Sequence, residues 1–271
     1  MILRFALVSL FISTCFLPIA HAETLTARQI MERVDDRDDG DRRTAEMRMV
    51  LTDKNGDTRE RRIATFDKDA RGEGGAEDRR RIMFFLDPAD VKDTGFLTYD
   101  YDAYETDDDQ WLYLPALKKT KRIASSDKSG SFMGSDFNYS DMTRRNLDAY
   151  DFEILKDDAV RGAACWVIQS TPKTQDEIDE TGYQKSVVFV RQDNFVVVRA
   201  VHWTDTGGKL KYLDVTGLEQ IDGIWTITEM SMTTKKNKVV EHKTDLTFSN
   251  VRYNQDLDDQ LFTLRRLEKG M

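Results

Sequence analysis

Most of the chain shows the alternation of apolar and polar residues that is typical of half-buried β-strands. Residues 44–52 (TAEMRMVLT) and 58–66 (TRERRIATF) alternate in this way on either side of DKNGD, a turn sequence that predicts a β-hairpin. In the first segment Met47, Met49 and Leu51 fall on one face, because side chains two residues apart point the same way along a strand. The pattern therefore predicts a strand with one buried face.

Further strand-like segments follow along almost the whole chain. They occur at residues 80–86, 95–101, 110–115, 118–124, 151–157, 165–171, 185–191, 195–203, 209–217, 224–234, 239–248 and 261–264. Short strands at a spacing of roughly ten residues, with turn residues between them, favour a single antiparallel sheet that is curled or closed. We expect a mostly β (α+β) protein with about eleven strands. The glycine-rich residues 70–78 are expected to form a hairpin loop.

Residues 26–36 (TARQIMERVDD) are the clear exception to the strand pattern. Ile30 and Val34 recur at helical spacing, and Thr26 with Gln29 matches a capping box. The sequence therefore predicts one helix before the first strand.

The N-terminal residues 1–22 resemble a secretory signal peptide. They contain one basic residue (Arg4), an apolar run and the cleavage sequence Ala-His-Ala at 20–22. A membrane anchor is the alternative, and it is disfavoured because the apolar run is short for a bilayer span. We expect cleavage before Glu23 and, in the absence of a linker or repeat, a single domain at 23–271.

Charge and cysteine content narrow the class of protein further. The chain has 40 Lys and Arg and 49 Asp and Glu, and loss of Arg4 with the signal peptide leaves a net charge of −10. Such a surface disfavours nonspecific binding to nucleic acid or to anionic membranes. Cys165 is the one cysteine after cleavage, so no intramolecular disulfide can form, and its apolar surroundings predict a buried, poorly reactive thiol.

Patterns for catalysis and metal binding are weak. His202 and His242 belong to no H-x-x-H or H-E-x-x-H arrangement, so we expect them to be core or surface residues. Acidic residues at 35–46 match part of a calcium loop, but Arg37 occupies a ligand position, which favours a solvated acidic helix end. A lipid hydrolase would need a nucleophile and a base, and the sequence offers no such pair. We expect no metal, no cofactor and no enzymatic activity.

Three neighbouring motifs carry a resemblance to a known family. They are LDPADVKDTGFLTYDY at 86–101, QWLYLPALKKTKRI at 110–123 and SGSFMGSDFNYSDM at 129–142. Together they resemble the outer membrane lipoprotein-sorting protein family, the LolA-like periplasmic proteins, and the resemblance extends over essentially the whole mature chain.

This resemblance implies both a fold and a function. The implied fold is a strongly curved antiparallel half-barrel, with a helix and a loop as a lid over the concave face. The implied function is carriage of a lipid or an acylated protein across the periplasm toward the outer membrane. Members of this branch often accompany export permeases of the resistance-nodulation-division (RND) type. The chain departs from the family in its greater length and in Phe84, which stands where relatives often carry a charged residue.

A carrier of this kind has to shield acyl chains from water. Exposure of one sixteen-carbon chain costs on the order of 12 kcal/mol, at about 0.8 kcal/mol per methylene. Methionine and aromatic side chains suit such a cavity because they adapt to variable chains. The candidate ligand-binding residues are Met47, Met49, Met83, Phe85, Phe96, Trp111, Tyr113, Phe132, Met133 and Phe137.

The loop at 129–142 is interpreted as a flap at the mouth of this cavity. Its glycines permit movement, and Phe132 and Met133 would turn inward over the cargo. A short helical run after Ser140 would anchor its far end. The alternative is a fixed loop whose aromatic side chains fill an ordinary core.

Basic residues on both sides of the loop suggest where an anionic headgroup could bind. The candidate headgroup-binding residues are Lys119, Lys121, Arg144 and Arg145. The alternative is that they pair with nearby aspartates on a solvated face.

The sequence therefore predicts a soluble, non-enzymatic and monomeric periplasmic carrier. Its expected partners are the lipid or acylated cargo, an inner-membrane RND-type transporter and an outer-membrane acceptor, with no nucleic acid. The alternative function is that of an accessory protein of such a transporter, which acts through protein–protein binding.

Overall fold

The computed structural model describes residues 25–71, 78–103, 106–205 and 207–271. The predicted signal peptide and most of the predicted loop at 70–78 lie outside these residues. The strands are β1 (Arg42–Asp53), β2 (Thr58–Asp69), β3 (Arg79–Asp87), β4 (Gly95–Asp100), β5 (Asp109–Leu114), β6 (Lys119–Arg122), β7 (Tyr150–Val160), β8 (Ala163–Pro172), β9 (Tyr183–Arg191), β10 (Val197–Thr204), β11 (Lys209–Ile221), β12 (Ile224–Lys236) and β13 (Val239–Tyr253). The helices are α1 (Ala27–Asp35), α2 (Gln175–Thr181) and α3 (Leu264–Lys269).

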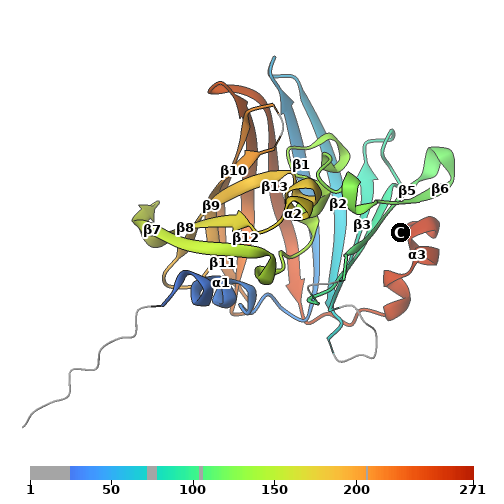
Figure 1. Ribbon diagram of the computed structural model, residues 1–271. Helices are drawn as coiled ribbons and strands as arrows, with labels where there is room; N and C mark the ends of the chain where they lie inside the picture. The colour runs from blue at the N-terminus through green and yellow to red at the C-terminus, as the bar shows by residue number, and fades with distance from the viewer. Residues whose placement is uncertain (1–24, 72–77, 104–105, 206) are drawn as a thin grey trace, which may run out of the picture.

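The strands form one antiparallel sheet that curves into an open half-barrel (Figure 1). This confirms the predicted fold class, with 13 strands in the described chain where about eleven were expected. The predicted strand at 261–264 is wrong, because a short 3₁₀ helix at Asp259–Phe262 precedes α3 there. The side chains of Asp258 and Thr263 accept hydrogen bonds from the first turn of each helix, and such caps favour helical turns over a strand.

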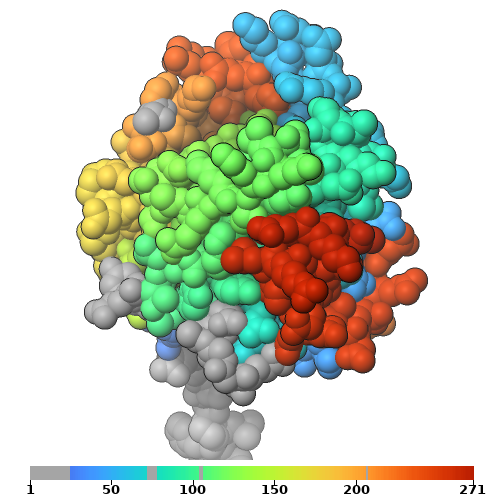
Figure 2. Space-filling model, turned by 90° about the vertical axis from the view of Figure 1, so that its right-hand side faces the viewer, coloured from blue at the N-terminus to red at the C-terminus, as the bar shows by residue number. Residues whose placement is uncertain are grey.

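The strand order explains why the chain contains a long irregular segment. Strands β1 to β6 follow one another to one edge of the sheet, β13 to β7 lead to the other edge, and β1 pairs with β13 in the middle. The chain must therefore travel from one edge to the other between β6 and β7. Residues 123–149, here called the crossing segment, make this connection on the inner side of the sheet (Figure 1). In the space-filling view its green surface lies between the turquoise and the yellow parts of the chain (Figure 2).

Helix α1 confirms the predicted N-terminal helix. Thr26 caps it and forms the expected capping box with Gln29. Ile30 is fully buried and packs against Ile168 and Val190, so the helix covers the part of the sheet made by β8 and β9. None of the described helices combines the length and the apolar character needed to cross a bilayer.

The C-terminal helix α3 covers the outer side of the opposite half of the sheet. Leu267 is fully buried against Phe84 and Phe262. Gly95 permits this contact, because a Cβ atom at that position would lie 2.6 Å from Leu267 Cδ1. Phe84 therefore anchors the C-terminal helix, while its neighbour Met83 points to the inner side.

Cys165 provides a direct test of burial in β8. Its side chain is fully buried, and burial raises the pKa of the thiol. Since the thiolate is the reactive form, we expect alkylation of the native protein to be far slower than alkylation in denaturant. Timed mass spectrometry measures both rates, and rapid labelling of the native protein would contradict this packing.

Candidate functional site

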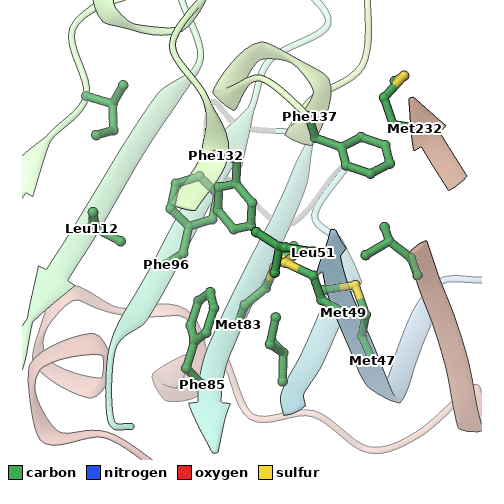
Figure 3. Close-up of a cluster of buried hydrophobic side chains, with 13 residues drawn as sticks. Met47, Met49, Leu51, Met83, Phe85, Phe96, Leu112, Phe132, Phe137 and Met232 are labelled. Atoms are coloured by element: carbon green, nitrogen blue, oxygen red, sulfur yellow. The ribbon is translucent and has the colours of Figure 1, made fainter. Parts of the chain in front are cut away.

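Buried apolar side chains gather on the inner side of the sheet beneath the crossing segment (Figure 3). This inner cluster includes seven of the predicted ligand-binding residues, namely Met47, Met49, Met83, Phe85, Phe96, Phe132 and Phe137. Met133 packs against it from the crossing segment. The strand register produces the grouping, because Met47, Ile63 and Phe85 stand side by side on β1, β2 and β3. Met232 joins the cluster from a strand whose alternation also predicted an inward methionine. The members that were not predicted as cavity residues are Leu51, Ile63, Leu112, Ile123 and Leu246.

Trp111 and Tyr113 do not join the inner cluster, and this corrects their predicted place in the cavity wall. Both pack with the outer cluster under the C-terminal helix, where the Trp111 ring lies 5.1 Å from that of Tyr99. Leu112 lies between them in β5 and points inward. Both faces of β5 are apolar, so alternation alone could not show which face is the inner one.

A cavity of about 220 Å³ lies between the sheet and the crossing segment. Its apolar wall is formed by Met47, Met49, Met83, Met230, Leu246 and Phe248. Phe132 and Phe137 close it from the crossing segment. An apolar cavity of about 150 Å³ can hold a benzene molecule, so this space is large enough for part of an alkyl chain.

Phe132 is packed as tightly as a core residue. It is 1% exposed, and its ring lies 5.0 Å from the ring of Phe96 and 5.6 Å from that of Tyr139. The inward direction of this side chain agrees with the flap interpretation. Its nearly complete burial agrees with the alternative, a fixed loop whose aromatic side chains fill the core. The next residue, Met133, is only half-buried and has a left-handed backbone conformation.

Asp136 fastens the crossing segment to the sheet. Its buried carboxylate accepts hydrogen bonds from the hydroxyl groups of Thr234 at 2.5 Å and Thr244 at 2.7 Å. Nδ1 of His242 lies 2.6 Å from the same carboxylate. Three side chains of β12 and β13 therefore converge on one residue of the loop. This role of His242 could not be predicted, since no local pattern links it to a residue 106 positions away.

Further bonds hold the crossing segment to α2 and β11. The Asn138 side chain donates to the Thr181 carbonyl oxygen at 2.8 Å and accepts from Lys211 at 2.6 Å. The helical run predicted after Ser140 is not formed. A short 3₁₀ helix, Tyr139–Met142, starts with a reciprocal cap between Asn138 and Asp141, and the backbone is extended again at Thr143.

The four predicted headgroup-binding residues are not brought together. Lys119 is exposed on the edge strand β6, and Lys121 pairs with Asp127 at 3.2 Å on the surface. Arg145 pairs with Asp141 at 3.0 Å. Lys121 and Arg145 therefore have aspartate partners, as the alternative interpretation predicted.

Arg144 is likewise occupied by a carboxylate. It lies 3.0 Å from Asp39, which also binds Arg79 at 2.6 Å. Asp39 was one of the residues of the weak calcium pattern, and its contacts are with arginine. Within the described residues, no group of three or more His, Cys, Asp or Glu side chains is arranged to hold a metal ion.

A partly buried row of charges at one end of the cavity was not predicted from the sequence. The register places Arg43, Asp67 and Arg81 side by side on β1, β2 and β3. Arg43 Nε lies 3.3 Å from the Asp67 carboxylate, and Arg81 Nε donates to its other oxygen. Burial alone would raise the pKa of Asp67, but the guanidinium groups of Arg81 and Arg43 outweigh it and lower the pKa to about 2. Asp67 is therefore ionised at neutral pH.

The curved open sheet and its covered inner cavity define a LolA-like half-barrel, and the relatives of the chain agree. A family model described as "uncharacterized protein" matches residues 77–269. A DUF1329 family protein from Desulfovibrio piger is 32% identical, with a TM-score of 0.79, and the match covers 89% of this chain and 97% of that chain. The chain belongs to the DUF1329 family.

Two further structures extend the comparison. A Vibrio parahaemolyticus protein described as an outer membrane lipoprotein-sorting protein domain is 29% identical, with a TM-score of 0.79, over 89% of this chain and 98% of that chain. A LolA superfamily protein from Nitrosomonas europaea shares the fold, with 20% identity, a TM-score of 0.66 and coverage of 90% and 100%. No curated protein matches the chain. The resemblance to LolA-like lipoprotein-sorting proteins is thereby confirmed.

Proposed function

We propose that this protein is a non-catalytic carrier that holds the acyl chains of a lipid or an acylated protein and moves them across the periplasm. The observation that carries the proposal is the apolar cavity between the inner face of the sheet and the crossing segment. A buried cavity of this kind offsets the roughly 0.8 kcal/mol that each exposed methylene costs in water.

The side chains of the cavity wall suit acyl chains that vary in length and shape. Five methionines line the cavity, namely Met47, Met49, Met83, Met142 and Met230. Their unbranched side chains adapt to irregular partners, whereas branched residues hold one shape. The description of the Vibrio relative as a lipoprotein-sorting domain supports the same general role. An RND-type donor and an outer-membrane acceptor belong to this proposal, with the protein acting as a monomer between them.

Lipid extraction of the purified protein, followed by mass spectrometry, is the first test. We expect a co-purified lipid or acyl species, and we expect a lipophilic fluorescent probe to bind with a stoichiometry of about one to one, since the proposal places a single ligand in this cavity. Absence of both lipid and probe binding would overturn the carrier function and favour the accessory protein that acts through protein contacts.

A variant that fills the cavity tests whether the probe binds there. Met230 is half-buried and lines the cavity, so Met230→Trp should reduce probe affinity by about tenfold or more, at a stability cost of about 1–3 kcal/mol. Val239→Trp is the matched control, because Val239 lies in the neighbouring strand β13 with 67% of its surface exposed. Equal probe affinity in the two variants would place the probe elsewhere.

A further inference from the structure

We propose that the cavity selects an anionic amphiphile, whose terminal oxyanion binds Arg43 and Arg81 while its alkyl chain lies along the methionine wall. This inference rests on the proposed carrier function. It narrows the cargo to molecules that end in a carboxylate or a phosphate.

The inner face of the sheet changes from apolar to charged along the strands. On β1 Met49 and Met47 are followed, in steps of two residues, by Ala45 and Arg43. On β3 the same step leads from Met83 to Arg81. Since side chains two residues apart share a face, both arginines stand on the face that carries the methionines, and both line the same cavity. An amphiphile placed along these strands would have its polar end at the arginines.

The direct ion pairs at this end leave one guanidinium group in excess. Among the described residues, Asp67 is the one carboxylate within ion-pair distance of Arg43 and Arg81. The carboxylate that lines the cavity itself, Asp141, is already paired with Arg145 at 3.0 Å. Two guanidinium groups therefore share one carboxylate, and the wall keeps one positive charge that an anionic ligand can neutralise.

Both arginines have N–H groups that can serve a ligand. Each directs its Nε atom toward Asp67, and Arg81 Nη1 donates to the Met142 carbonyl oxygen at 2.9 Å. A guanidinium group carries five N–H donors, and the two side chains are still 22% and 25% exposed beside the cavity. Carboxylate and phosphate groups match this planar donor pattern, and such charge-assisted bonds are stronger where water is excluded.

The test compares three sixteen-carbon probes, each below its critical micelle concentration: palmitate, hexadecyl phosphate and hexadecanol. We expect the wild-type protein to bind the two anions about 10- to 100-fold more tightly than the alcohol, as measured by titration calorimetry. This advantage should shrink as salt is added. The ratio of the affinities for palmitate and hexadecyl phosphate then shows whether a fatty acid or a phosphate-bearing lipid is the preferred source of the oxyanion.

Arg81→Met should remove most of this preference, because Asp67 would then neutralise Arg43. Arg43→Met combined with Asp67→Asn leaves Arg81 as a single free cation, and this double variant should keep the preference for anions. Arg48→Met is the matched control, since Arg48 lies in the same strand β1, faces outward and pairs with Glu60 at 2.6 Å. Retained binding by the double variant would show that the charged row can be changed without unfolding of the protein.

Equal affinity of the wild-type protein for all three probes would overturn the inference and leave the carrier function in place. Equal losses for all three probes in Arg81→Met, with none in Arg48→Met, would also overturn it. Failure of every probe to bind the wild-type protein would overturn the carrier function together with the inference.

Discussion

Replacement of Asp136 by alanine is expected to lower the free energy of unfolding by about 3 kcal/mol, because each buried donor left without an acceptor costs about 1–3 kcal/mol. Asp136 is 4% exposed, and its carboxylate receives hydrogen bonds from Thr234 and Thr244 and lies 2.6 Å from His242 Nδ1. Alanine would leave these donors of β12 and β13 without their acceptor. Urea unfolding followed by circular dichroism measures the change.

Asp127→Ala is the control for a change of charge in the same segment. Asp127 pairs with Lys121 at 3.2 Å, and both side chains are more than half exposed. Such surface pairs contribute about 0–1 kcal/mol, so little change is expected. Equal stability of the Asp127→Ala and Asp136→Ala variants would show that the buried carboxylate does not hold the crossing segment.

Hydrogen exchange separates local detachment from general destabilisation. In the Asp136→Ala variant we expect the amides of residues 129–142 to exchange faster, while those in the middle of β1 and β2 remain protected. The reason is that a segment can open locally with a smaller free energy than global unfolding. Uniformly faster exchange in the whole sheet would instead make Asp136 an ordinary core residue.

The fold could be predicted from the sequence because its main signal is local. Alternation at 44–52 and 58–66 becomes the β1–β2 hairpin, and the capping box at Thr26 begins helix α1 as expected. Which face of each strand points to the inner side of the sheet was harder to predict. In β5 both faces are apolar, and only the packing of Leu267 and its neighbours shows that Trp111 lies on the outer side.

The candidate site was predicted in its apolar part and missed in its charged part, for a physical reason. The burial of apolar residues such as Met47 can be predicted, because they recur at every second position of one strand. The row of Arg43, Asp67 and Arg81 depends on the register of three strands, which no single segment encodes. The basic residues beside the loop were grouped because they are close in sequence, but the strand order puts Lys121 on the edge strand, away from the arginines of the cavity.

Phe132→Ala is expected to be the most destabilising change within the apolar site, at about 3–5 kcal/mol. Phe132 is 1% exposed and packs against Phe85, Phe96 and Tyr139. Met133→Ala, at the half-buried next position, should cost much less and serves as the matched control. Urea unfolding of both variants measures the difference.

The same pair of variants shows whether Phe132 occupies space that cargo can use. A void left by Phe132→Ala would join the existing cavity, which Phe132 lines, and an apolar ligand could fill both. A ligand that binds the native state stabilises it more when it binds more tightly. Palmitate should therefore raise the unfolding midpoint of Phe132→Ala more than that of the wild type or of Met133→Ala. This larger rise in the unfolding midpoint is expected if the crossing segment is a flap, because cargo must displace Phe132 in the wild type but not in Phe132→Ala. Equal gains in all three proteins would mean that Phe132 fills a core separate from the ligand, and the crossing segment would then be a fixed cover.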